Sequence, residues 1–180
     1  MSFVLRLATG DEVTRLQTLI AASVRTLSAG YYTPQQIESA LIHVFGVDTQ
    51  LIADGTYYAM ETEEDATLVA CGGWSRRATL YGSDRAKAGR PDALLDPARD
   101  PARVRAFFVH PDWARHGLGQ RLLARCEDAA REAGFHRITL AATLPGEPFY
   151  LRYGYEPLER VDVPMADGVT LPIVNMTKSL

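Results

Sequence analysis

The feature that most constrains the fold is a buried strand that leads through a turn into a glycine-rich helix start. Residues 104–109 are almost continuously apolar, which is typical of a central strand buried on both faces. His110-Pro111-Asp112 ends this strand, and Gly117 and Gly119 begin a helix whose apolar positions recur at helical spacing. Gly134 ends the helix as a C-terminal cap. The chain therefore contains a strand–turn–helix unit.

The glycine-rich turn favours an anionic ligand. Gly117 and Gly119 let the backbone approach a ligand closely, and the unpaired N–H groups of the first helical turn point at it. Arg115 adds to the positive helix end, so we interpret the turn as a pyrophosphate site. It lacks the third glycine of a dinucleotide fingerprint and the Gly-Lys-Ser/Thr of a P-loop, which disfavours nicotinamide and ATP. The alternative is an ordinary strand-to-helix turn, where a short Gly-x-Gly also occurs.

Around this unit the chain predicts an α/β fold. Thr33, Pro34 and Gln36 have the pattern of a capping box with proline at the first helical position. Residues 76–102 contain three prolines, two glycines and many charges, and predict a long loop that is either a substrate lid or a surface insertion. We expect strands at residues 3–8, 56–61, 67–75, 104–109, 136–142, 158–163 and 171–176, and helices over residues 11–27, 34–45, 118–133 and 145–153.

Composition and charge narrow the class of protein. A length of 180 residues fits one globular domain, and 47% hydrophobic with 23% charged residues excludes a disordered or coiled-coil chain. A net charge of -3 gives no general attraction to nucleic acid or to an anionic membrane. Without a long apolar run or a cleavage-site pattern we expect a cytoplasmic protein. Cys71 and Cys126 are expected to be reduced core thiols, and no metal is implied.

Two segments resemble the signatures of the GNAT superfamily of acetyl-CoA-dependent N-acetyltransferases. Residues 107–123 resemble its acetyl-CoA motif, in which a hydrophobic strand, a His-Pro turn and a Gly-x-Gly helix start follow in fixed spacing. Residues 148–155 resemble its second signature, an aromatic-Tyr pair followed after three residues by Gly-aromatic. The order of the surrounding elements also matches. The resemblance implies one N-acetyltransferase domain over residues 1–180, with a mixed, mostly antiparallel, twisted sheet of about seven strands and helices on both faces.

The same resemblance implies the chemistry. Acetyl-CoA is the expected co-substrate, and a primary amine of a small molecule or peptide is the expected acceptor, attacked directly without a covalent enzyme intermediate. Tyr150 is the expected general acid to the leaving thiolate. The pantetheine arm is expected along the strand and the pyrophosphate on the turn. The residues so assigned to the cofactor are Phe107, Phe108, Val109, Arg115, His116, Gly117, Leu118, Gly119 and Gln120.

Three places depart from the family pattern. Ala114 stands where Gln or Arg is often found, and Thr143 stands where Asn is common. The central strand has Arg103-Val104-Arg105 where many relatives carry a Glu as base, so the base is unassigned. His110 and ordered water are the alternatives. These departures leave open two other hypotheses, a non-catalytic acyl-CoA sensor and an interaction module that uses the long loop.

The sequence does not identify the acceptor amine. Tyr31, Tyr32, Trp74 and the long loop lie where the resemblance puts the substrate cleft, and a core or surface role is the alternative for each. The edge strands and the C-terminal hairpin leave a homodimer open. Arg76, Arg77, Arg85, Lys87 and Arg90 make the loop basic, which suggests an acceptor with a carboxylate or phosphate.

Overall fold

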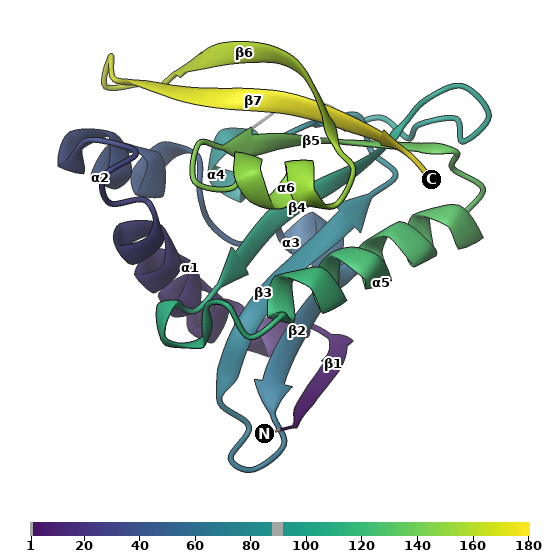
Figure 1. Cartoon of the computed structure of the whole chain (residues 1–180), viewed down its shortest axis with the longest axis horizontal. Helices are drawn as coiled ribbons and strands as arrows, with labels where there is room; N and C mark the ends of the chain where they lie inside the picture. Colours follow the sequence, from purple (N-terminus) through teal and green to yellow (C-terminus); the bar gives the residue numbers. More distant parts are fainter. Residues whose placement is uncertain (1, 88–91) are drawn as a thin grey trace.

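A computed structural model describes residues 2–87 and 92–180 and contains, within them, a seven-stranded mixed sheet (Figure 1). The strand order is β1-β2-β3-β4-β5-β7-β6, and the pair β4–β5 is parallel while the other neighbouring pairs are antiparallel. This confirms the predicted α/β class. The strands are β1 (Phe3–Leu7), β2 (Tyr57–Thr62), β3 (Leu68–Ser75), β4 (Ala102–Val109), β5 (Arg137–Thr143), β6 (Glu156–Pro164) and β7 (Thr170–Ser179).

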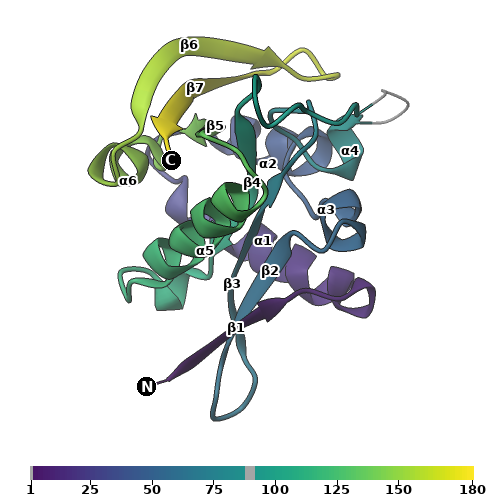
Figure 2. The ribbon, with the colours of Figure 1, turned by 90° about the vertical axis from the view of Figure 1, so that its right-hand side faces the viewer.

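Helices cover both faces of the sheet, as predicted. In Figure 2, where the central strands are seen nearly edge-on, α5 and α6 lie on one face and α1, α2 and α3 on the other. The helices are α1 (Val13–Leu27), α2 (Pro34–His43), α3 (Thr49–Ala53), α4 (Asp84–Lys87), α5 (Leu118–Glu132) and α6 (Glu147–Arg152), with short 3-10 turns at Gly10–Glu12 and Pro111–Trp113.

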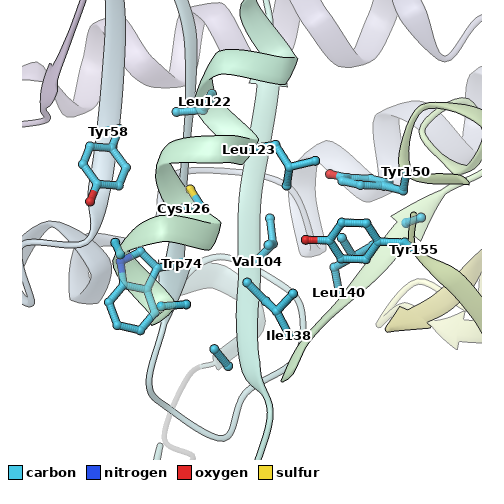
Figure 3. Packing of buried hydrophobic residues seen from close by; sticks show 14 of the residues in the cluster. Tyr58, Trp74, Val104, Leu122, Leu123, Cys126, Ile138, Leu140, Tyr150 and Tyr155 are labelled. Carbon is cyan, nitrogen blue, oxygen red and sulfur yellow. The ribbon is translucent and has the colours of Figure 1, made fainter. Parts of the chain in front are cut away.

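Each face has its own hydrophobic core. The α5-side core packs Leu122, Leu123 and Cys126 of the helix against strand residues such as Val104 and Ile138 (Figure 3). The α1-side core packs two helices on the opposite face of the sheet, with Leu16, Ile20, Ile37 and Leu41 among its members. Cys71 and Cys126 are buried free thiols, one in each core, as expected.

Local sequence signals explain where several helices begin and end. The Thr33 hydroxyl accepts a hydrogen bond from the Gln36 N–H at 3.1 Å, and the Gln36 side chain accepts one from the Thr33 N–H at 3.0 Å, which confirms the capping box. Gly134 follows α5 with φ of 89°, the left-handed conformation expected of a C-terminal glycine. Helix α3 was not predicted. The predicted loop at residues 76–102 contains one helical turn, α4.

Within residues 2–87 and 92–180, no helix combines the length and the apolar character needed to cross a membrane.

Candidate active site

Strand β4 carries a β-bulge at its centre. The register with β3 shifts there, so that Gly72 faces both Ala106 and Phe107. A Cβ at Gly72 would lie 2.6 Å from the Phe107 ring, so the close approach of the two strands requires glycine. Ala106 has φ of 51°, a left-handed conformation that an alanine rarely adopts. Because of the bulge, successive side chains of β4 do not simply alternate between the two faces of the sheet.

Strands β4 and β5 are paired at one end and diverge toward the other (Figure 1). Their ladder, over the described residues, consists of Ala102 opposite Ile138 and Arg103 opposite Thr139. An Arg103 guanidinium N–H donates to the Thr139 hydroxyl at 2.6 Å and fastens the strands where the ladder ends. Beyond this point, the edge of residues 106–109 that faces β5 is open to another extended chain.

A pocket passes through the sheet where the two strands separate. Gly119, Phe149 and Tyr150 line it on the α5 side. Val24 and Phe45 line it on the α1 side, so the same pocket reaches both cores. A ligand that enters from the α5 side can therefore meet a second ligand that enters from the α1 side.

The glycine-rich turn forms a concave backbone. Arg115 has φ of 70° and Gly117 has φ of 77°, and left-handed residues at this spacing aim neighbouring N–H groups toward one point. Gly117 precedes the first residue of α5, so the free N–H groups of the first helical turn lie beside it. A Cβ at Gly117 would meet nothing within 4 Å, which means that conformation rather than space requires this glycine. The turn fits an anion such as a pyrophosphate.

The structure brings most of the predicted cofactor residues to two adjoining places. Phe107, Phe108 and Val109 line the pocket along the open edge of β4, and Gly119 lines it from the start of α5. The Leu118 side chain is buried in the α5-side core, so only its backbone is available to a ligand. Arg115, His116, Gly117 and Gln120 are exposed in the turn and the first turn of α5.

Tyr150 lies on α6, in the wall of the pocket, and is 8% exposed. Its ring makes edge contacts with Phe107, Phe149 and Tyr155, and in Figure 3 the hydroxyl groups of Tyr150 and Tyr155 are directed toward α5. Burial, with a smaller contribution from Cys126, raises the pKa of the Tyr150 phenol above its ordinary value. The phenol is therefore protonated at neutral pH and can donate a proton.

His110 has a structural role at the end of β4. Its Nδ1 accepts a hydrogen bond of 3.3 Å from the Asp112 N–H, and it caps the 3-10 turn that follows. It does not belong to the pocket wall, whereas Thr143 does. The Thr143 hydroxyl accepts a hydrogen bond of 3.3 Å from the Gly146 N–H and so shapes the turn into α6.

The aromatic residues proposed for the acceptor lie away from the pocket wall. Trp74 is buried in the α5-side core and makes an edge contact with Phe135. The Tyr32 hydroxyl donates to the Pro172 carbonyl at 2.7 Å and accepts from the Leu144 N–H at 2.9 Å, so it joins distant segments. Tyr31 is 54% exposed. The long loop does reach the pocket, through Leu80, Tyr81 and Gly82.

The basic loop gives limited support to an anionic acceptor. Arg77 donates to both carboxylate oxygens of Asp54, at 2.6 and 2.8 Å, and is used in holding the loop. Arg76 is exposed and does not line the pocket. The remaining three cations cannot be placed: Arg90 and the side chains of Arg85 and Lys87 lie outside the described residues.

A buried ion cluster beneath the pocket was not predicted. The Arg105 side chain is fully buried, pairs with Asp48, and lies 3.5 Å from an Asp92 carboxylate oxygen. It also donates to the Gly82 carbonyl at 3.3 Å. In the sequence, Arg105 stood out only because it lies on the strand where a Glu was expected as base. No residue near it in the chain indicates that it pairs with Asp48. The structure shows that it ties the long loop to β4.

Residues 94–180 match the family model described as an acetyltransferase (GNAT) domain. The chain carries a GNAT acetyltransferase domain. The match includes the glycine-rich turn, the diverging strands and Tyr150. The chain is thus an acetyltransferase.

Solved GNAT structures share the whole fold. A GCN5-related N-acetyltransferase from Rhodopseudomonas palustris is similar with a TM-score of 0.73 and 20% identity, covering 100% of this chain and 97% of that one. The PaiA N-acetyltransferase from Thermoplasma acidophilum, crystallised with coenzyme A, has a TM-score of 0.67 and 15% identity, with 100% of both chains covered. A mosquito arylalkylamine N-acetyltransferase-like 5b protein has a TM-score of 0.64 and 18% identity, covering 99% of this chain and 100% of that one. A search of curated sequences finds no significant match.

Proposed function

We propose that this GNAT enzyme transfers the acetyl group of acetyl-CoA to a primary amine of a small molecule or peptide by direct attack, with Tyr150 as the general acid. The observation that carries the proposal is the pocket between β4 and β5, which reaches both faces of the sheet and has a buried, protonated tyrosine in its wall. The same tyrosine favours an enzyme over a non-catalytic sensor, because a sensor needs no proton donor there.

Two places in the chain support the assignment of the cofactor residues. The open edge of Phe107, Phe108 and Val109 is suited to a pantetheine arm that adds to the sheet as an extended chain. The turn from Arg115 to Gln120 is suited to the pyrophosphate, through its backbone N–H groups and the Arg115 charge. Ala114 offers no polar side chain, so these backbone donors carry more of the binding.

The chemistry requires a polarised carbonyl and a proton for the leaving sulfur. Acetyl-CoA supplies the thioester; the C–N bond forms as the C–S bond breaks, and the nitrogen loses one proton. Tyr150 holds the proton that the thiolate takes up. The bulge at Ala106 leaves backbone N–H groups of β4 outside the ladder, where they can stabilise the oxyanion. The described residues of the pocket wall include no Asp or Glu that could act as the general base. We therefore assign the removal of the amine proton to ordered water.

We further propose that residues 1–180 form one N-acetyltransferase domain in which residues 76–102 act as a substrate lid. The matched segment cannot complete the sheet alone, since β4 pairs with β3, which precedes it. Leu80, Tyr81 and Gly82 reach the pocket, and Arg105 holds the Gly82 carbonyl. The Arg105 side chain thus holds the Gly82 part of the loop next to the pocket that the loop would cover.

Calorimetric titration with acetyl-CoA tests the cofactor site. Gly117→Val should lose at least about tenfold in affinity, because a branched side chain strains the left-handed turn. Gly168→Val is the matched control: Gly168 has φ of 83°, open space around it, and a place in the β6–β7 turn. The control should bind like the wild type. Equal affinity in both variants would contradict the pyrophosphate assignment.

The role of Tyr150 is tested by Tyr150→Phe, measured as kcat with saturating acetyl-CoA. General acid catalysis contributes about 10²–10⁴-fold, so kcat should fall within that range while acetyl-CoA affinity stays unchanged. Tyr153→Phe, on a tyrosine that follows the same helix and does not line the pocket, should keep its kcat. A Tyr150→Phe enzyme with normal kcat would rule out Tyr150 as the general acid.

A further inference from the structure

Most side chains on the α1 side of the pocket are apolar. Helix α1 contributes Val24 and Leu27, the link after α2 contributes Phe45, and β4 contributes Phe108. Val163, Leu171 and Ile173 of the C-terminal hairpin close the opposite side. With the loop at Leu80–Gly82 these walls come from five separate parts of the chain, an arrangement that encloses a small molecule rather than an extended peptide.

The charges around this side are already paired. Of the described residues in the pocket wall, Arg105 is the one with a formal charge, and its side chain is fully buried against Asp48 and near Asp92. The other titratable groups of the wall are Tyr81 and Tyr150, and burial raises the pKa of the Tyr150 phenol, which is therefore neutral at pH 7. No carboxylate of the described wall is therefore available as a counterion for an ammonium group.

A charged amine is disfavoured by such a wall. An ammonium ion that leaves water for an apolar pocket without a partner pays a large desolvation cost. An aliphatic amine with a pKa like that of lysine is neutral in roughly one molecule in a thousand at pH 7. An aromatic amine is neutral in nearly every molecule, and it needs no base before it attacks. Ser23 and Ser28 in the same wall can hydrogen-bond a neutral amino group.

We infer that the acceptor is an apolar small molecule whose amino group is uncharged at neutral pH, as in an aromatic amine, and that it binds on the α1 side of the pocket. This inference rests on the proposed function, because it takes the α1 side as the acceptor site. It also replaces the expectation of an acceptor with a carboxylate or phosphate, for which the described wall provides no free cation.

The test uses three matched amines: aniline, benzylamine, and aniline with a para-carboxylate. Release of free CoA at pH 7 gives kcat/KM for each, and calorimetry in the presence of CoA gives their binding independently of turnover. We expect aniline to exceed the other two by about tenfold or more in kcat/KM and to bind the most tightly. Raising the pH to 9 should increase the benzylamine rate steeply and leave the aniline rate unchanged.

The outcomes separate the inference from the proposed function. Preference for benzylamine or for the carboxylate at pH 7 would overturn the inference while keeping acetyl transfer. Acetyl-CoA binding without turnover of any of the three amines would overturn the inference as well. A protein that fails to bind acetyl-CoA would overturn the proposed function itself.

A designed counterion gives a second test. Leu27 is the last residue of α1, lines the pocket and is 37% exposed, so the fold should tolerate a polar side chain there. Leu27→Glu should raise the benzylamine-to-aniline ratio of kcat/KM by about fivefold, the value of a partly exposed ion pair of about 1 kcal/mol. Leu27→Gln, of the same size without the charge, should leave the ratio as in the wild type. An equal ratio in both variants would contradict the inference that charge excludes alkylamines.

Discussion

The Tyr57 hydroxyl donates a hydrogen bond of 2.9 Å to the carbonyl oxygen of Ala106, across the intervening strand β3. Gly73 of β3 makes room for this reach, because a Cβ there would lie 2.9 Å from the Tyr57 ring. Tyr57 is fully buried, so the bond is shielded from water. A side chain two strands away thus holds the strained residue of the bulge in place.

Tyr57→Phe should disturb both stability and catalysis. The substitution leaves the Ala106 carbonyl without this donor, a loss of about 1–3 kcal/mol for a buried polar group. Urea unfolding measures the loss, and kcat should fall because the bulge lies beside the proposed oxyanion site. Tyr58→Phe, on the adjacent residue that faces the other core, is the control and should retain kcat. Equal kcat in the two variants would mean that the Tyr57 bond does not serve catalysis.

Ala106→Gly should stabilise the protein. Alanine in the left-handed region costs about 1–2 kcal/mol relative to glycine, and φ of 51° places Ala106 there. Part of this gain is offset by the greater freedom of glycine in the unfolded chain, so we expect an increase of up to about 1 kcal/mol in the free energy of unfolding. Ala106→Val should instead lower the free energy of unfolding. A Gly variant less stable than the wild type would argue against strain at the bulge.

Arg105→Met should destabilise the protein strongly. Removing the cation breaks the fully buried ion pair with Asp48 and takes a positive charge away from Asp92, which costs about 3–5 kcal/mol. Arg103→Met, on the same strand, removes a cation that is only half-buried and should cost about 1 kcal/mol. Thermal and urea unfolding compare the two. If Arg105→Met lowered the free energy of unfolding no more than Arg103→Met does, the ion cluster would not anchor the loop.

Stability should fall in acid through Glu12. Hydrogen bonds from Arg6 are the main cause that lowers the Glu12 pKa from 4.5 to about 2. Since the folded-state pKa lies below the unfolded one, the contribution is complete above about pH 4.5 and is lost as the pH falls toward 2. We expect a loss on the order of 2 kcal/mol, measured by urea unfolding between pH 7 and pH 3. Glu12→Gln should be less stable at pH 7 and should show a shallower decline.

The elements that the sequence predicted well are those with local causes. The capping box at Thr33, the glycine-rich turn and the apolar run of residues 104–109 depend on residues close together in the chain. Helix α3 has five residues, too few for helical periodicity to be distinguished from chance. Glycine-rich turns and aromatic-Tyr pairs are short contiguous signals, which is why the two sides of the proposed cofactor site could be assigned in advance.

The features that the sequence did not predict depend on distant residues. Arg105 and Asp48 lie far apart in the chain, and the bulge arises from how β3 and β4 pair rather than from a glycine at residue 106. Tyr32 likewise meets Pro172, 140 positions away, and no periodicity connects the two. The apolar acceptor wall required the same three-dimensional information, since α1, the loop and the C-terminal hairpin all contribute to it.

The division of the pocket wall along the chain has a consequence for how specificity can change. The glycine-rich turn and Tyr150 lie inside the segment that the family model matches, whereas Val24, Phe45 and the loop at Leu80–Gly82 lie before it. A chimera that takes residues 1–93 from another GNAT protein would therefore exchange much of the acceptor wall and leave the cofactor half intact. If the proposed site assignments hold, acceptor choice and acetyl-CoA binding can be changed independently within one enzyme.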